Sequence, residues 1–126
     1  MSVLNNYEQM IKIADSCPSL KGKVYSIYPK ARTKTPFAII YRVGKIPDYV
    51  DVPECREALA TFTYSLDIYA QDNTSLQEIG DFVTNLYMPY NILITGDAPI
   101  RSPNKDVVGK SLTLRFQLDE YGCVTQ

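Results

Sequence analysis

The sequence contains no histidine among its 126 residues. The chain therefore cannot form a Ser-His-Asp triad or a Cys-His pair, and it lacks the commonest zinc ligand. Cysteine is also scarce, since only Cys17, Cys55 and Cys123 occur. These three are odd in number and far apart, so they predict neither a disulfide framework nor a paired-cysteine metal site. We interpret them as free thiols in a reducing compartment.

Long hydrophobic runs are absent as well. No apolar stretch approaches the ~20 residues that a membrane-spanning helix needs. The first eight residues hold neither a basic stretch nor a long apolar block, so we expect no signal peptide and folding in the cytosol. Hydrophobic residues make up 45% of the chain and charged residues 21%, with a formal net charge of −1. This composition is typical of a globular protein without an overall electrostatic attraction to nucleic acid or membranes.

The clearest pattern is a strict alternation over residues 61–70. One side of this stretch is apolar: Phe62, Tyr64, Leu66, Ile68 and Ala70. The other side is mostly polar: Thr61, Thr63, Ser65, Asp67 and Tyr69. A period of two predicts a strand with one buried face. A helix is expected after the break at residues 72–75, with a capping box at Thr74–Gln77 or Ser75–Glu78, and Pro89 should end it.

The remaining elements follow from weaker patterns. Apolar residues at helical spacing predict a helix from about Val3 to Ser16. Four further strands are expected, and the one at residues 37–43 is apolar on both faces, which favours an inner position in a sheet. These strands are Val24–Tyr28, Phe37–Val43, Ile92–Thr95 and Ser111–Asp119. Residues 44–58 and 96–107 are expected to be long loops, and residues 120–126 a loose tail.

The order α-β-β-β-α-β-β predicts one α+β domain over residues 1–126. Two helices must cover the apolar face of a mostly antiparallel sheet, which gives a two-layer architecture. The outer face of the strand at residues 61–70 is rich in Thr and Ser, and a face of that kind tolerates contact with another protein surface. Asp67 and Arg115 both fall on polar faces, so we expect them to pair if their strands are neighbours.

Short motifs give no candidate chemistry. Asp48, Asp51 and Glu54 recur every three residues but lack the glycine and the final glutamate of a calcium loop. Gly109-Lys110-Ser111 ends like a phosphate-binding loop, yet the earlier glycine is missing and a strand follows in place of a helix. The sequon at Asn73 is better explained by helix capping. We therefore expect no catalytic, metal-binding or cofactor-binding residue, and no enzyme.

Ten tyrosines are many for a chain of 126 residues. Aromatic side chains on a sheet can stack on RNA bases, but the RNP1 pattern is absent, and Tyr41 and Tyr64 are expected on core faces. Half-buried and interface positions explain the excess as well. An RNA-binding or protein-binding α+β module in the cytosol remains an alternative function.

Charge is unevenly placed along the chain. A segment without acids carries Lys21, Lys23, Lys30, Arg32 and Lys34, and a mostly acidic segment carries Asp48, Asp51, Glu54 and Glu57. Both segments can be plain solvated loops. They can also be complementary patches on opposite sides of a subunit that associates with itself.

The block 36–41 (PFAIIY), the strand 64–70 (YSLDIYA) that runs into a helix, and the ending with Ile100-Arg101-Ser102 and strand 111–116 (SLTLRF) are together similar to the tail completion proteins of long-tailed bacteriophages. These are also called tail terminator or head–tail joining proteins. The resemblance spans roughly residues 3–118 and rests on the order of elements, with no catalytic residue to carry over.

The resemblance implies a small α+β subunit of the virion tail that is assembled in the cytoplasm of the bacterial host. Such subunits form a ring, typically a hexamer, on the tail tube protein and offer a surface to the head connector or stopper protein. They use no cofactor, contact no membrane and read no nucleic acid sequence. From the sequence we nominate as interface residues Lys30, Arg32, Asp48, Tyr49, Asp51 and Arg101.

Overall fold

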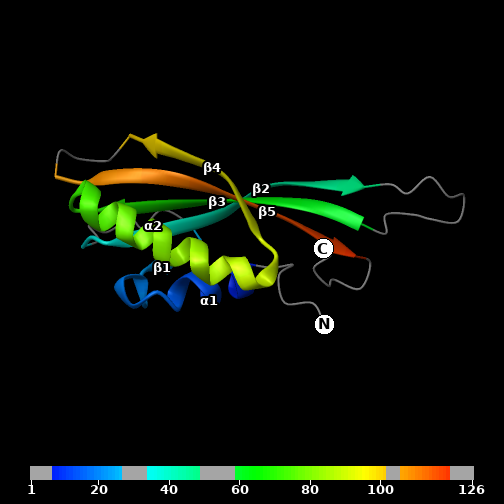
Figure 1. Ribbon diagram of the computed structural model, residues 1–126, viewed down its shortest axis with the longest axis horizontal. Coiled ribbons are helices and arrows are strands. Elements are labelled where there is room, and N and C mark those ends of the chain that lie inside the picture. The colour runs from blue at the N-terminus through cyan, green and yellow to red at the C-terminus, as the bar shows by residue number, and fades with distance from the viewer. Residues whose placement is uncertain (1–6, 27–33, 49–58, 102–105, 120–126) are drawn as a thin grey trace, which may run out of the picture.

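The computed structural model describes residues 7–26, 34–48, 59–101 and 106–119 (Figure 1). Two helices, α1 (Tyr7–Asp15) and α2 (Asn73–Tyr87), accompany a five-stranded sheet. The strands are β1 (Val24–Tyr25), β2 (Phe37–Asp48), β3 (Leu59–Ala70), β4 (Leu93–Ile100) and β5 (Val108–Asp119). Two one-turn 3-10 helices, η1 (Pro18–Leu20) and η2 (Met88–Tyr90), make the element order differ slightly from the expected one. The predicted α+β class is confirmed.

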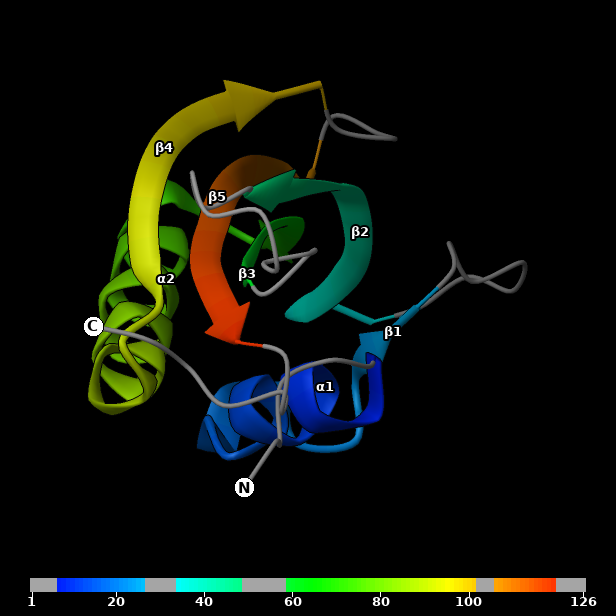
Figure 2. The same cartoon turned by 90° about the vertical axis from the view of Figure 1, so that its right-hand side faces the viewer.

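The sheet is twisted and mostly antiparallel, in the spatial order β1-β2-β3-β5-β4. Among the described strands, only the pair β1–β2 is parallel. Both helices lie on the same side of the sheet, as Figures 1 and 2 show. Helix α1 packs against β1 and β2, and α2 packs against β3 and β5. The architecture therefore has the two layers that the sequence predicts.

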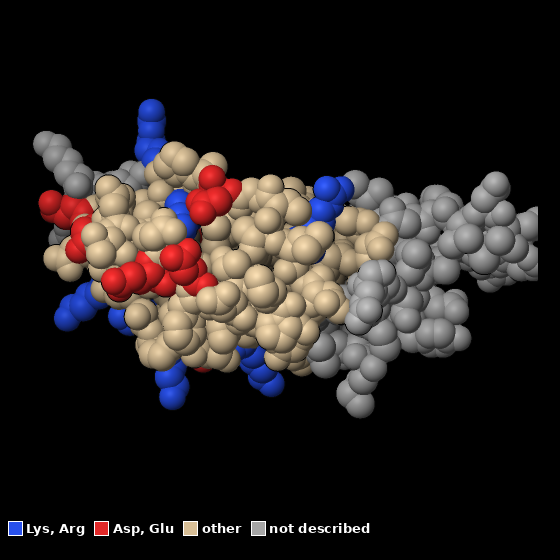
Figure 3. All heavy atoms as spheres, viewed as in Figure 1, with Lys and Arg blue, Asp and Glu red and all other residues tan. Residues whose placement is uncertain are grey.

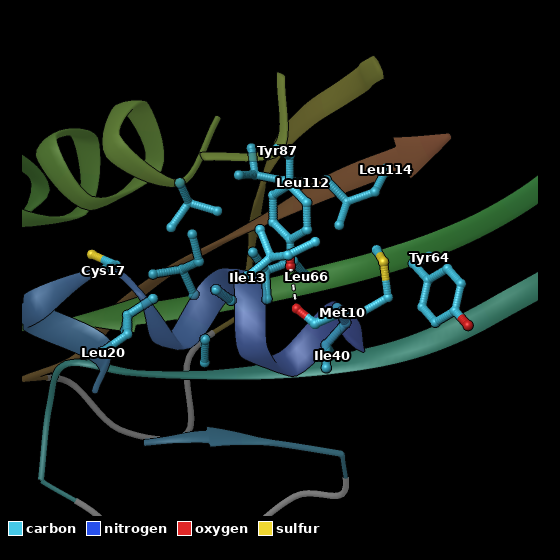
Figure 4. Packing of buried hydrophobic residues seen from close by; sticks show 14 of the residues in the cluster. Met10, Ile13, Cys17, Leu20, Ile40, Tyr64, Leu66, Tyr87, Leu112 and Leu114 are labelled. Carbon is cyan, nitrogen blue, oxygen red and sulfur yellow. Dashed lines mark hydrogen bonds between the residues drawn. The ribbon is translucent and has the colours of Figure 1, made fainter. Parts of the chain in front are cut away.

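The main core lies between the helices and the sheet. The apolar side of β3 is buried as predicted, and β5 and α2 contribute their periodic apolar residues to the same cluster. Tyr87 crosses this core from α2, and its hydroxyl donates a hydrogen bond of 2.8 Å to the backbone carbonyl oxygen of Met10 in α1 (Figure 4). Burial raises the pKa of Tyr87 far above its ordinary value. This bond ties the two helices together across the core.

Helix α2 begins two residues earlier than the Thr74–Gln77 capping box requires, and three residues earlier than the Ser75–Glu78 box requires. Its N-cap is Asp72, whose Oδ1 accepts a hydrogen bond of 2.7 Å from the backbone N–H of Ser75. The capping boxes predicted at Thr74 and Ser75 are therefore wrong, because those residues already belong to the first turn. An Asp at the N-cap satisfies one of the unpaired donors of that turn.

Strands β2 and β4 are longer than predicted. Residues 44–48 and 96–100 were expected to be loop, but they belong to these two strands. The pairing continues past Gly44 and Gly96 because β2 has a bulge at Val43 and β4 has one at Thr95, where the register shifts by one residue. Pro47 and Pro99 are tolerated because, among the described residues, each strand is bonded on one side only at that point.

The first elements are shorter than predicted where the structure describes them. Helix α1 ends at Asp15, and β1 covers two residues in place of five, because Ser26 is already in a bend. The expected helix start at residues 3–6 and the tail at residues 120–126 lie outside the described residues. Within the described ranges, no helix combines the length and the apolar character that crossing a bilayer requires.

Candidate interaction surfaces

One face of the sheet carries no described helix. On that face Phe37, Ile39 and Tyr69 form a second, smaller apolar cluster, in which the rings of Phe37 and Tyr69 stack with centroids 5.0 Å apart. Tyr69 pairs across the strands with Gly109, whose missing side chain leaves room for the ring. The expectation that β2 is apolar on both faces is confirmed by this cluster.

The same uncovered face continues as a band of small hydroxyl groups. Ser65 Oγ donates to Asp67 Oδ1 at 3.0 Å and lies 2.8 Å from Ser111 Oγ. Thr63 and Thr113 are half-buried neighbours of this group on β3 and β5. We call this surface the hydroxyl band, defined as Thr61, Thr63, Ser65, Ser111 and Thr113.

The expected pair of Asp67 and Arg115 is wrong. Their strands are indeed neighbours, but the register places Asp67 opposite Ser111 and Arg115 opposite Thr63. The two side chains are thus four residues apart along the ladder, or roughly 13 Å at the usual rise per strand residue. Strand register is set by tertiary pairing, which the polar pattern of each strand alone does not determine.

Tyr41 does not lie in the core, contrary to the prediction. It pairs with Ser65 beside the hydroxyl band and is 40% exposed, whereas Tyr64 is completely buried on the helix side. Val43 at the bulge is also exposed, at 62%. The face without a described helix therefore presents the ring of Tyr41 near its hydroxyl groups, and the bulge next to it exposes Val43.

Of the six nominated interface residues, four lie outside the described residues: Lys30, Arg32, Tyr49 and Asp51. Arg101 is exposed directly after β4. Asp48 is the last residue of β2 and pairs in register with Leu59. Arg101 therefore lies near the start of β2 and Asp48 at its end, which puts them roughly 35 Å apart for a twelve-residue strand. The structure does not bring these two positions together.

A different charged surface lies on α2. Its exposed side carries Glu78 and Asp81, and the amide of Gln77 donates a hydrogen bond of 3.0 Å to Asp81 Oδ1. Red side chains gather over this helix in Figure 3, while several blue ones project from the lower edge of the molecule. This surface is not among the predicted interface residues, although the sequence carries a signal for it: residues 71–100 contain four acids and no lysine or arginine.

A cleft of about 350 Å³ separates the first half of α2 from η1 and the start of β2. Glu78 and Phe82 line it from α2, and Pro18 and Ser19 line it from η1. Phe82 is 46% exposed, which is high for so large an apolar side chain. Cys17 lines the floor as a buried free thiol. The cleft therefore offers a carboxylate and an aromatic ring to whatever enters it.

Lys110 is a buried cation next to this helix. Its Nζ lies 3.3 Å from Asp97 Oδ2, and its side chain runs over Gly80 of α2, where a Cβ atom would lie only 2.5 Å from Lys110 Cε and Nζ. The pair joins edge strand β4 to β5 next to α2. Residues 109–111 lie within β5, so the expected strand occupies the place of a phosphate-binding loop.

Within the described ranges, no group of three or more Cys, Asp or Glu side chains gathers as a metal site would require. Comparison of the sequence with models of known protein families and with curated proteins finds no match. The interpretation of these surfaces therefore depends on their own geometry and chemistry.

Proposed function

We propose that this chain is a structural subunit of the tail of a long-tailed bacteriophage or a related tail-like particle. In this role it forms a ring on the end of the tail tube, stops tube polymerisation and offers a joining surface to the head connector or stopper protein. The proposal is supported by the resemblance of the sequence and by the two-layer α+β fold, which is the fold that the resemblance implies.

One observation carries the proposal: the sheet is much longer than its helical cover. Strands β2, β3 and β5 have 12 residues each, against 15 residues in α2 and 9 in α1. At the usual rise per residue, the strands are about 40 Å long, and the helices only about 22 Å and 13 Å. Part of the sheet therefore runs beyond the helices, as Figure 1 shows for β2 and β3. A sheet larger than its own core requires is suited to contact with other subunits.

The uncovered face of the sheet supports the same role. The hydroxyl band consists of short side chains, of which Ser65 is buried and the other four are half-buried, and Tyr41 adds apolar area beside it. Aromatic residues are enriched at the centres of protein interfaces, where charge is depleted. A ring also requires two different surfaces on each subunit, because each copy must contact its neighbours head to tail.

The experiment that tests this function measures the mass of the chain in solution by light scattering, with and without assembled tail tubes, and images the tube ends. We expect a ring, either in solution or as a cap on tube ends, and tubes of limited length when the protein is added during assembly. A chain that neither forms rings nor binds tube ends refutes the proposal.

The second candidate function is a small α+β module that binds RNA or a protein partner. The exposed ring of Tyr41 on the uncovered face favours it, because single-stranded RNA is recognised by stacking on sheet aromatics. Titration with single-stranded RNA at several salt concentrations tests this alternative. Binding that weakens with salt and is lost in Tyr41→Ala supports it, and absence of binding at low salt removes the RNA form of it.

A further inference from the structure

The charged side chains of the described residues form two surfaces of opposite sign. Residues 71–100, which form α2, η2 and β4, hold four acids and no lysine or arginine. The described residues before β2 hold four lysines against the two acids Glu8 and Asp15. We call the lysines the basic edge, defined as Lys12, Lys21, Lys23 and Lys34. We call the exposed side of α2 the acidic surface, defined as Glu78, Asp81 and Phe82.

The two surfaces lie on different elements, and these elements meet at the cleft between α2 and η1. The basic edge accompanies α1, η1 and β1, at the edge of the sheet that β1 forms, whereas α2 lies in the same layer as α1 and packs over β3 and β5. In Figure 2, α2 lies at the left and β1 at the right, with α1 below the sheet between them. Each surface is largely solvent-exposed in a single chain: Lys12, Lys21 and Lys34 are exposed, and so are Glu78 and Asp81.

The acidic surface also has an apolar anchor. Phe82 is 46% exposed at the rim of the cleft, and Glu78 lines the same cleft. An aromatic ring next to a carboxylate suits a lysine or arginine, whose aliphatic stem packs on the ring while its charged end reaches the carboxylate. The chemistry of the acidic surface thus fits the side chains that the basic edge supplies.

Main-chain pairing between two copies through edge strand β4 is less favourable than a contact through side chains. Edge strand β4 contains Pro99, which has no N–H to donate, and the bulge at Thr95 interrupts its regular ladder. Bulges and prolines are features that protect edge strands from pairing with another chain. A contact between copies through side chains on α2 avoids this obstacle.

We propose that the acidic surface of one copy binds the basic edge of a second copy of the same chain, with Phe82 and the adjacent cleft at the centre of the contact. The contact joins two different surfaces, so its repetition propagates head to tail and can close a ring. The inference deepens the proposed function and rests on it for the size of the assembly. It replaces the acidic segment at residues 48–57 by α2 as the partner of the lysines.

The test is a charge exchange between the two surfaces, followed by sedimentation equilibrium at low salt. The variant Glu78→Lys/Asp81→Lys and the variant Lys12→Glu/Lys21→Glu should each weaken self-association at least about tenfold, because attraction becomes like-charge repulsion at several positions. The variant that carries all four changes restores opposite charges across the contact, so its self-association should return towards the wild-type value.

Two controls separate this contact from general effects of charge. Arg42→Glu changes an exposed cation on β2 that belongs to neither surface and pairs with Tyr64, not with the hydroxyl band, and it should leave self-association unchanged. Phe82→Ala keeps every charge but removes the apolar anchor, and it should weaken association without changing its salt dependence. Circular dichroism melts check that each variant is folded.

Failure of the inference and failure of the function give different results. The inference is refuted if the wild-type protein stays monomeric up to millimolar concentration. It is also refuted if the variant with all four changes self-associates as weakly as the two double variants. In either case, caps of wild-type protein on tail-tube ends would still support the proposed function through another contact. Self-association that behaves as predicted, with no binding to tube ends, would instead refute the function and retain the contact.

Discussion

The glycine beneath Tyr69 gives the sharpest test of the fold. A Cβ atom at Gly109 would lie 2.9 Å from Tyr69 Cδ1, 3.0 Å from Tyr69 Cε1 and 3.1 Å from Ile100 Cγ1. The Tyr69 ring cannot easily withdraw, because it is buried and stacked on Phe37. Overpacking of this kind costs about 1–3 kcal/mol. Replacing a strand glycine by alanine recovers about 0.5–1 kcal/mol through the unfolded chain.

We therefore expect Gly109→Ala to lower the free energy of unfolding by about 1–2 kcal/mol. Gly44→Ala is the matched control, since Gly44 also lies in a strand but has nothing within 4 Å of its added Cβ atom. That variant should be stable to within about 1 kcal/mol of wild type, on the favourable side. Urea unfolding followed by circular dichroism measures both differences.

A double variant that also removes the Tyr69 ring tests whether this ring causes the destabilisation. With Tyr69→Ala in place, Gly109→Ala should destabilise much less, because the Tyr69 ring is gone and only the 3.1 Å approach to Ile100 Cγ1 is left. If Gly109→Ala stabilises the wild-type chain as much as Gly44→Ala does, the packing of Tyr69 over Gly109 is refuted.

Two further predictions concern the helices. Tyr87→Phe removes the hydrogen bond to the Met10 carbonyl and should cost about 0.5–1.5 kcal/mol of unfolding free energy in a urea titration at neutral pH. Because burial raises the pKa of Tyr87 above its unfolded value of about 10, the folded state keeps this proton when the unfolded state loses it, so stability should fall as pH rises above about 10. Tyr87→Phe should flatten that fall, and an identical decline in both proteins would contradict the assignment. Asp72→Ala removes the N-cap bond to Ser75 and should cost about 1 kcal/mol, with Asp72→Asn closer to wild type; equal stability of the three proteins would argue against this cap.

Much of the fold could be predicted because local patterns agree with tertiary burial. The alternation of β3 and β5 and the periodicity of α2 each place one apolar face toward a common core, and all three are confirmed. The extent of β2 and β4 could not be predicted, since Gly44, Pro47, Gly96 and Pro99 are typical of loops. Bulges and one-sided pairing tolerate them in strands, and neither is visible before the partner strands are known.

The candidate surfaces, like the fold, were predictable from the sequence only in part. The sequence alone contains the segregation of charge, with no lysine or arginine at residues 71–100 and lysines clustered before β2. What it does not contain is the placement of these charges. Only the tertiary structure puts α2 over β3 and β5 with β1 at the edge of the sheet, Arg101 and Asp48 at opposite ends of the sheet, and Asp67 away from Arg115. The physical reason is that composition and periodicity are local properties of the chain, whereas register and strand order depend on contacts between residues far apart in sequence.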